Sequence, residues 1–264
     1  MKKLNKERFG PWAVITGASS GIGKEMARMI AQRGIHTVLV ARDKEALEAL
    51  AKEIENDAKV QTKVITADLA KEEEIARIIE ACDDLEVGLL INSAGYALSG
   101  AFLDHGVDEE LDMLDVNTKA PLILSHHFGT KMRERKRGGI IFFASIMAFA
   151  GASNWANYNA TKAYNMLLAE GLAQELKQDN VAVLALAPGS TISGFQERSH
   201  TQSATGAMEA KTVAKRGLWM LGCKRTYVPG LVNKLIAFST RLNPRALNSA
   251  IFSAVVKQLT SKGA

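Results

Sequence analysis

The stretch Thr16-Gly17-Ala18-Ser19-Ser20-Gly21-Ile22-Gly23 joins a short apolar run, residues 13–16, to a helical pattern at residues 22–33. Its glycines therefore occupy a strand-to-helix turn, where residues without a β-carbon let backbone amides and a helix N-terminus approach a phosphate. The spacing is G-x3-G-x-G rather than the G-x-G-x-x-G of the standard dinucleotide fingerprint, but the physical requirement is the same. A glycine turn can also be purely structural, and its position between strand and helix is what favours a pyrophosphate ligand.

Outside this turn, short apolar runs alternate with longer amphipathic segments, a pattern typical of strand-helix-strand units in a parallel sheet. Runs such as HTVLVA and VAVLALA are apolar throughout, which predicts a sheet covered by helices on both faces. The fold class is therefore α/β, a Rossmann-like, doubly wound parallel sheet in three α/β/α layers, with ligands beyond the carboxyl ends of the strands. The expected strands are residues 13–16, 37–41, 63–67, 89–92, 140–144 and 181–187, and the expected helices are residues 22–33, 44–56, 72–81, 109–133 and 156–177.

The chain of 264 residues is expected to form a single domain around one core. After Pro188 the pattern changes to a polar segment and a basic amphipathic segment, followed by a last strand and two helical stretches. We interpret residues 190–264 as a substrate lid and C-terminal helical extension of the same domain. These elements are expected at residues 190–206, 208–221, 225–228, 231–242 and 244–258.

The formal net charge is +5, but the basic residues are scattered, which argues against a nucleic-acid-binding protein. The densest cluster, residues 131–137, coincides with an expected helix end and is interpreted as a solvated terminus, although phosphate-bearing ligands fit the excess charge equally well. Cys82 and Cys223 lack metal-ligand spacing, so neither a disulfide framework nor a metal site is expected. No apolar run has membrane-spanning length. We predict a cytoplasmic protein, with membrane-surface contact by the basic, apolar C-terminus as a poorer alternative.

Tyr158 and Lys162 lie four residues apart in a strongly helical segment, so their side chains share one face. A phenol is a poor acid at neutral pH, but a neighbouring ammonium stabilises the phenolate and lowers the pKa of the phenol. Such a pair is more often exposed helix surface. Ser145 favours a functional role for this pair, because it ends a central strand at the rim where ligands bind. Its hydroxyl is suited to hold a carbonyl oxygen. Asn117 is either a polar helix-interior residue or a local break that holds water in a proton path.

In their order and spacing these residues resemble the short-chain dehydrogenase/reductase family over residues 12–195. The resemblance includes the glycine turn, Asn117, Ser145, and the run from Tyr158 to Lys162. It extends to Asp68-Leu69 after the third expected strand, Asn92-Ser93-Ala94-Gly95 after the fourth, and Pro188-Gly189. Ser93 departs from the family pattern, which usually has a second asparagine there.

The resemblance implies that Tyr158 protonates the carbonyl oxygen during reduction while Ser145 orients it. It implies that Lys162 holds the nicotinamide ribose and lowers the tyrosine pKa, with Asn117 supporting a water that links the lysine to solvent. The implied cofactor-binding residues besides Tyr158 and Lys162 are Gly17, Ser19, Ser20, Gly21, Ile22 and Gly23 in the turn, Asp68 and Leu69 at the adenine, Asn92, Ala94 and Gly95 on the cofactor floor, and Pro188, Gly189 and Thr191 at the nicotinamide.

Preference between the two nicotinamide cofactors is decided where the second expected strand ends, in Val40-Ala41-Arg42-Asp43. An arginine there accommodates the 2′-phosphate of NADP(H), whereas a carboxylate binds the free ribose hydroxyl of NAD(H). Arg42 occupies the position that the phosphate-binding arginine has in similar NADP-dependent members of the family. Asp43 comes one place later, where it would face solvent or cap the next helix. NADP(H) is therefore favoured over NAD(H).

Residues 224–244 resemble a branch of the family that includes long-chain 3-oxoacyl reductases and 17β-hydroxysteroid dehydrogenases. Apolar residues at 217–221 and 231–238 could cover a long hydrophobic substrate, although core packing or a subunit interface are commoner roles. We expect a homodimeric or homotetrameric enzyme that interconverts carbonyl and alcohol groups on an apolar or acyl-type small molecule. The alternative is a regulatory or sensor protein that binds NADP(H) with little turnover, but the complete set of proton-transfer residues favours the enzyme.

Overall fold

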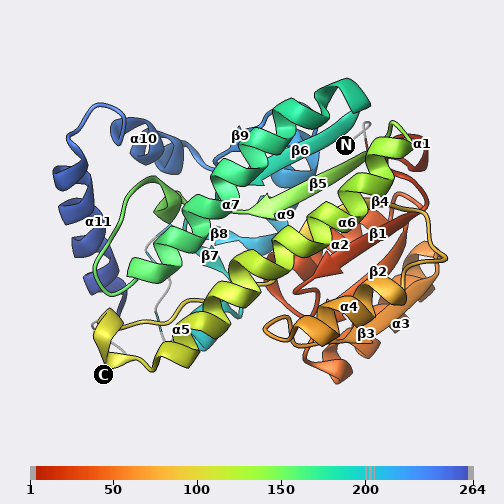
Figure 1. Ribbon diagram of the computed structural model, residues 1–264, viewed down its shortest axis with the longest axis horizontal. Coiled ribbons are helices and arrows are strands. Elements are labelled where there is room, and N and C mark those ends of the chain that lie inside the picture. Colours follow the sequence, from red (N-terminus) through yellow and green to blue (C-terminus); the bar gives the residue numbers. More distant parts are fainter. Residues whose placement is uncertain (1–3, 200, 202–203, 205, 261–264) are drawn as a thin grey trace.

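The computed structural model describes residues 4–199, 201, 204 and 206–260, which form one α/β domain (Figure 1). Its main sheet is parallel, with seven strands in the order β3-β2-β1-β4-β5-β6-β9. The strands are β1 (Trp12–Thr16), β2 (His36–Ala41), β3 (Thr62–Thr66), β4 (Val87–Asn92), β5 (Gly138–Phe143), β6 (Val181–Leu186) and β9 (Thr226–Tyr227). Every expected strand is present, with its ends displaced by no more than two residues, so the predicted doubly wound sheet is confirmed.

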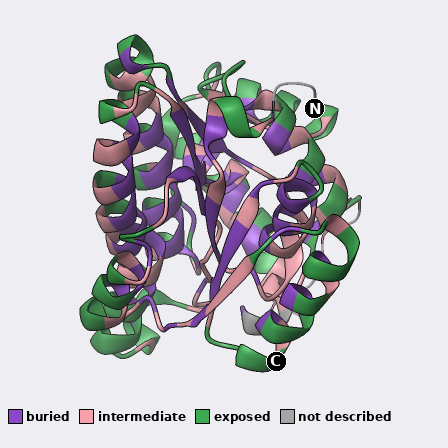
Figure 2. Cartoon of the chain, turned by 90° about the vertical axis from the view of Figure 1, so that its right-hand side faces the viewer, coloured by how far each residue is buried: buried purple, intermediate pink, exposed green. Residues whose placement is uncertain are grey.

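Helices cover both faces of this sheet, and Figure 2 shows the buried strands enclosed between them. Along β1, Ala13 and Ile15 pack into one apolar cluster and Val14 into the other, which explains why the strands are apolar on both sides. One layer consists of α2 (Gly21–Ala31), α3 (Lys44–Ala58) and α9 (Ala210–Met220), and the other of α4 (Glu72–Glu80), α6 (Ala120–Glu134) and α7 (Ala156–Glu175).

The sheet changes its direction of growth at β1. The chain builds outward from β1 to β3 and then crosses to β4 on the opposite side of β1. Thr16 and Asn92, the last residues of β1 and β4, are paired in register. The carboxyl ends of these two strands therefore form the topological switch point at which open α/β sheets bind ligands.

The expected helix at residues 109–133 is interrupted. α5 (Val107–Leu114) leads into a π-helical turn, η2 (Asp115–Lys119), before α6 begins. A π turn inserts an extra residue into a helix and is frequent at functional sites. Asn117 lies in this turn, so the structure corrects the expected continuous helix and shows a local break at this residue.

The C-terminal segment divides into two parts. α9 packs beside α2 in the helix layer, because Val213, Ala214 and Leu218 are buried there. α10 (Leu231–Ser239) and α11 (Arg245–Thr260) lie beyond the carboxyl ends of the strands, at the left-hand end of Figure 1. The remaining elements are α1 (Lys6–Phe9), the 3-10 turns η1 (Phe102–Asp104), η3 (Ile146–Phe149) and η4 (Leu176–Asp179), α8 (Phe195–Arg198), and a parallel pair of β7 (Thr191–Ile192) and β8 (Met208–Glu209). Within the described residues, no helix combines the length and apolar character that a membrane span needs.

Candidate active site

Three glycines shape the turn that follows β1. Gly17 and Gly21 have φ angles of +67° and +57°, in the left-handed region that favours glycine. A β-carbon on Gly17 would lie 2.8 Å from the amide nitrogen of Ala94, and one on Gly23 would collide with the carbonyl oxygen of Gly17. The turn thus packs directly against the loop that follows β4.

The N-terminus of α2 opens from this turn. Ser19 and Ser20 precede the helix, while Gly21, Ile22 and Gly23 form its first turn. The first backbone N–H groups of a helix have no partner within the helix and attract phosphate. A close backbone approach next to free helix amides is the cradle that a dinucleotide pyrophosphate requires, so this part of the structure fits the predicted cofactor.

Arg42 and Asp43 follow β2 and have different roles. The carboxylate of Asp43 caps α3 by accepting a 3.0 Å hydrogen bond from the backbone N–H of Ala46. Arg42 is solvent-exposed and close enough to Tyr96 to influence its titration. Burial raises the pKa of Tyr96 to about 12, and the positive charge of Arg42 opposes that rise. The structure therefore leaves Arg42 available to a ligand, while Asp43 is engaged by the helix.

Asp68 and Leu69 follow β3 on the same side of the site. Oδ1 of Asp68 accepts a 3.2 Å hydrogen bond from the N–H of Ala70, and Leu69 is buried. Asp68 also influences the titration of Tyr96. Arg42, which follows β2, and Asp68, which follows β3, therefore both influence Tyr96, a residue that the sequence analysis missed.

Ser145 lies two residues after the end of β5. Its Oγ accepts a 3.1 Å hydrogen bond from the N–H of Met147 and lies 3.5 Å from the carbonyl oxygen of Pro188, to which it donates. These contacts fix the hydroxyl at the carboxyl end of β5 and close to the end of β6, as predicted from its place at the end of a central strand.

Tyr158 lies in the first turn of α7 and is buried among aromatic rings. Its ring meets Trp155 edge-on at a centroid distance of 5.3 Å and lies 5.7 Å from the ring of Phe195. Burial raises the pKa of Tyr158, and a hydrogen bond with the side chain of Ser145 lowers it. The two hydroxyls therefore meet in largely apolar surroundings, which favour the neutral phenol over the phenolate.

Lys162 lies one turn further along α7 and is also buried. Its Nζ donates a 3.1 Å hydrogen bond to the carbonyl oxygen of Phe143 and lies 5.6 Å from the centroid of the Tyr158 ring. Burial lowers the pKa of Lys162 to about 8. A β-carbon on Gly95 would lie 3.3 Å from this Nζ, so the loop after β4 runs directly past the ammonium.

The π turn holds Asn117 against this loop. Its Nδ2 donates to the carbonyl oxygen of Tyr96 at 2.9 Å and to Oγ1 of Thr161 at 3.1 Å, while its Oδ1 accepts from the N–H of Tyr96 at 3.1 Å. Asn117 is fully buried. It therefore joins α7 to the loop after β4 and lies next to the group formed by Ser145, Tyr158 and Lys162.

The loop after β6 completes the rim. Thr191 is buried and donates a 3.0 Å hydrogen bond from Oγ1 to the carbonyl oxygen of Gly189, and a β-carbon on Gly189 would collide with Asn233 of α10. Asn92 is directed differently, because its Nδ2 donates to Oγ of Ser125 in α6 at 2.9 Å. Its amide nitrogen is thus bonded to the helix layer, while its Oδ1 is buried without a hydrogen-bond partner among the described residues.

Asn165 is a buried polar residue of this group that the sequence analysis overlooked. Its Nδ2 donates to the carbonyl oxygen of Asn117 at 2.8 Å and lies 3.4 Å from the carbonyl oxygen of Phe143, the group that also accepts from Lys162. The signal was present in the sequence, since Tyr158, Lys162 and Asn165 are spaced i, i+4, i+7 and therefore face the same side of a helix.

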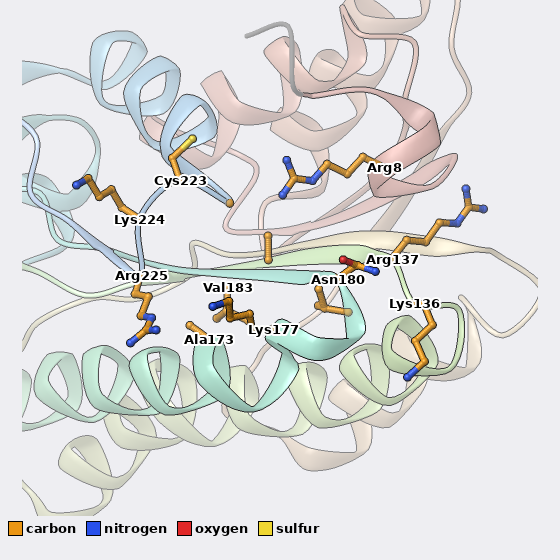
Figure 3. A pocket seen from close by; sticks show the side chains of 13 residues that line it. Arg8, Lys136, Arg137, Ala173, Lys177, Asn180, Val183, Cys223, Lys224 and Arg225 are labelled. Atoms are coloured by element: carbon orange, nitrogen blue, oxygen red, sulfur yellow. The ribbon is translucent and has the colours of Figure 1, made fainter.

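A cavity of about 610 Å³ lies at the opposite end of the sheet, near the start of β6 (Figure 3). Its cationic lining residues point in different directions: Arg8 is directed toward the Cys223 side, and Lys136 and Arg137 point outward. Lys136 is paired with Asp179, and Arg137 with Glu86. The cavity is therefore separate from the group of buried residues at the carboxyl ends of the strands.

Comparison with known proteins gives a consistent result. Residues 11–204 match the model of the family described as short chain dehydrogenase. The chain is 35% identical to a 7beta-hydroxysteroid dehydrogenase of Clostridium sardiniense over 234 residues, which cover 87% of this chain and 89% of that protein. A short-chain dehydrogenase from Sphingobium yanoikuyae, solved in complex with NADPH, superposes with a TM-score of 0.80 at 30% identity and covers 88% of this chain and 93% of its own. A solved 7beta-hydroxysteroid dehydrogenase gives a TM-score of 0.86 at 25% identity, with coverage of 92% and 96%.

Proposed function

The chain belongs to the short-chain dehydrogenase/reductase family, oxidoreductases that interconvert C=O and CH–OH groups with a nicotinamide cofactor, and from this premise we propose that it is an NADP(H)-dependent enzyme for bulky, apolar, steroid-like ketones and alcohols. The observation that carries the proposal is the buried group at the carboxyl end of β5, where the hydroxyls of Ser145 and Tyr158 meet beside Lys162. Proton-transfer residues in this arrangement serve turnover and have no use in a protein that only senses a cofactor.

When bound at this site, NADPH would supply the hydride that reduces the carbonyl carbon of the substrate. Tyr158 donates its phenolic proton to the carbonyl oxygen, and Ser145 donates a hydrogen bond to the same oxygen and orients it. The apolar surroundings of Tyr158 keep the phenol protonated until the negative charge develops on the substrate. In oxidation of the alcohol the same residues act in the opposite sense.

Lys162 and Asn117 serve Tyr158. The ammonium of Lys162 stabilises the phenolate that remains after proton transfer, an effect opposite to that of burial. We assign the nicotinamide ribose to the same ammonium, because the loop at Gly95 runs directly past it. Asn117 fixes the distance between that loop and α7 through its bonds to Tyr96 and Thr161. The water path implied for Asn117 remains part of this proposal.

The substrate class is inferred from the surroundings of Tyr158 and from the relatives. Met147, Trp155, Phe252 and Val256 belong to the same apolar cluster as Tyr158, and α11 supplies the last two. A large apolar skeleton suits such a lining. A relative covering most of the chain is named for a hydroxysteroid reaction, which favours a polycyclic alcohol over a short aliphatic one.

A panel of carbonyl and alcohol compounds followed by NADPH absorbance tests this function. The panel includes steroid ketones, a long-chain 3-oxoacyl thioester and small aliphatic ketones. We expect kcat/KM for a steroid ketone to exceed that for the small ketones at least tenfold. Preference for the thioester would replace the substrate class, and NADPH binding without turnover of any compound would favour the sensor alternative.

Replacement of Arg42 by alanine tests the cofactor assignment. A charge-assisted hydrogen bond to the 2′-phosphate is worth about 1.5 to 3 kcal/mol, so the KM for NADPH should rise roughly ten- to over a hundredfold. The KM for NADH should change little, because that cofactor lacks the phosphate, and the rate at saturation should be nearly preserved. Steady-state constants for both cofactors check this. An equal weakening toward both would assign Arg42 to the fold, and a wild-type preference for NADH would reject the assignment.

Replacement of Asn165 by leucine tests whether this residue positions Lys162. The substitution keeps the approximate volume but removes the donor to the carbonyl oxygens of Asn117 and Phe143, so the second carbonyl can draw Lys162 away from Tyr158. We expect kcat to fall about tenfold, a cost of roughly 1.4 kcal/mol, with a displaced pH profile and little change in the KM for NADPH. An unchanged pH profile, even with a lower kcat, would leave Asn165 a purely structural residue.

A further inference from the structure

The cavity near the start of β6 is lined by cationic side chains from distant parts of the chain (Figure 3). They come from α1, the turn before β5, η4 and the segment before β9. No aspartate or glutamate lines the cavity in the part of the chain that the structure describes. The fold therefore gathers positive charge in a concave site of about 610 Å³, a volume typical of small-molecule pockets. The cationic residues are Arg8, Lys136, Arg137, Lys177, Lys224 and Arg225.

Most of this charge has no acidic partner. Lys136 pairs with Asp179 and Arg137 with Glu86, and both pairs leave the cavity nearly neutral on that side. Glu170 of α7, which faces β9, bonds to the hydroxyl of Thr226. The other four cations form no ion pair with any described residue, and like charges gathered in this way favour a bound anion. These four are Arg8, Lys177, Lys224 and Arg225.

The backbone of β6 adds hydrogen-bond donors to the same cavity. Successive residues of a parallel strand bond to opposite neighbours. Leu186 bonds on the β5 side, whereas Ala185 donates its N–H to the carbonyl oxygen of Arg225 at 2.7 Å, so the odd-numbered residues face β9. The pairing with β9 begins only at Ala185. The N–H groups of Val181 and Val183 therefore face the cavity rather than a neighbouring strand, and both residues line it.

The four free cations flank this open strand edge. In Figure 3, Arg8 and Lys224 extend on one side of β6, and Lys177 and Arg225 lie on the other side, toward α7. The guanidinium of Arg8 packs over the backbone of Gly222, where a β-carbon would collide with it. An anion at the edge of β6 is thus within the field of cations from both faces of the sheet and meets unpaired strand amides.

We infer that this cavity binds a small molecule that carries two phosphate groups, at a site separate from the predicted nicotinamide site. A phosphate monoester carries about −1.5 to −2 charges at neutral pH, so two phosphates balance the four free cations. Arginine and lysine hold phosphate through charge-assisted hydrogen bonds. Among the described residues no aromatic side chain lines the cavity, so nothing there would stack on a nucleobase, and recognition rests on the phosphates.

Isothermal titration calorimetry of the full chain with inorganic pyrophosphate tests this site. Because pyrophosphate also suits the cradle before α2, the titration is made with and without excess NADPH. The affinity of the cavity should stay within about twofold when NADPH is present. Lys177→Gln with Arg225→Gln should raise the dissociation constant at least tenfold, since charge-assisted hydrogen bonds are lost. Both side chains are exposed, so the fold should be unaffected.

Arg8→Gln is a second variant, on the other side of β6, and should raise the dissociation constant about fivefold or more. Lys211→Gln with Lys215→Gln is the matched control, because these exposed lysines of α9 do not line the cavity. This control should bind pyrophosphate within about twofold of the wild type.

Citrate replaces pyrophosphate in a further titration, because it is a polyanion without phosphate. It should bind at least tenfold more weakly, since each phosphate offers three strong acceptor oxygens. Equal affinity for citrate would overturn the assignment to phosphate. Absence of binding to the wild type, equal losses in the cavity and control variants, or binding that NADPH abolishes and the cavity variants leave unchanged would overturn the site itself.

Discussion

Tyr158→Phe is expected to lower kcat for carbonyl reduction by about a thousandfold while NADPH affinity stays within about twofold of the wild type. General acid catalysis contributes 10² to 10⁴ in rate, and the substitution removes only the transferable proton. The phenylalanine ring keeps the packing against Trp155 and Phe195, so the pocket retains its shape. Steady-state kinetics with NADPH titration by fluorescence measures both quantities.

Tyr164→Phe is the matched control for this prediction. Tyr164 is on the same helix but 40% exposed, away from the buried group. Its substitution should leave kcat and NADPH affinity unchanged. Retention of more than a few per cent of activity by Tyr158→Phe would show that another group donates the proton, and a parallel loss of NADPH affinity would indicate a structural role for the hydroxyl.

Lys162→Met is expected to reduce kcat at least a hundredfold and, unlike the tyrosine variant, to weaken NADPH binding as well. The ammonium is proposed to stabilise the phenolate of Tyr158 and to hold the ribose, so its loss affects both steps. Methionine fills a similar volume without charge. The same kinetic and titration measurements apply, and an unchanged affinity for NADPH would remove the ribose from the role of Lys162.

The free energy of unfolding of the same variant should depend on pH differently from that of the wild type. Because burial lowers the native pKa of Lys162 from 10.5 to about 8, the unfolded chain binds more protons between these values. The free energy of unfolding of the wild type therefore gains a contribution that rises with pH across this window, and Lys162→Met lacks it. Denaturant unfolding should show the wild type gaining about 1.5 kcal/mol on the variant between pH 8 and 9.5. Lys177→Met, at an exposed lysine beyond α7, should show no such gain, and a pH-independent difference for Lys162→Met would contradict the lowered pKa.

The fold was largely predictable because the sequence patterns that mark its strands and turns are local. Continuous apolar runs such as the one containing Val14 and Ile15 mark strands buried on both faces, and the glycine turn marks where the first of them ends. Strand order depends on contacts between distant segments, so the position of β4 beside β1 was not readable from any single run. α1 and the β7–β8 pair are too short for a periodic signal, and the extra residue of the π turn at Asn117 is invisible to a pattern of period 3.6.

The site was predictable where chemistry and spacing coincide, as for Tyr158 and Lys162, and less so where a role depends on surroundings. The ammonium of Lys162 was expected to lower the pKa of Tyr158, but burial raises that pKa, and the group that opposes the rise is the side chain of Ser145. Burial is a tertiary property. Tyr96 was missed because only the folded chain brings it near Arg42 and Asp68. Asn165, in contrast, was accessible from its spacing to Lys162.

The hydrogen bond from Ala46 to Asp43 constrains how the proposed preference for NADP(H) could change by mutation. The carboxylate of Asp43 is already bonded to the N-terminus of α3, and releasing it would remove a helix cap worth about 1 kcal/mol. Substitutions that turn Asp43 toward the cofactor would therefore lower the stability of the protein before they increase its preference for NADH. Replacement of Arg42 by an acidic residue avoids this loss. It removes the arginine and supplies a carboxylate in one substitution, while Asp43 continues to cap α3.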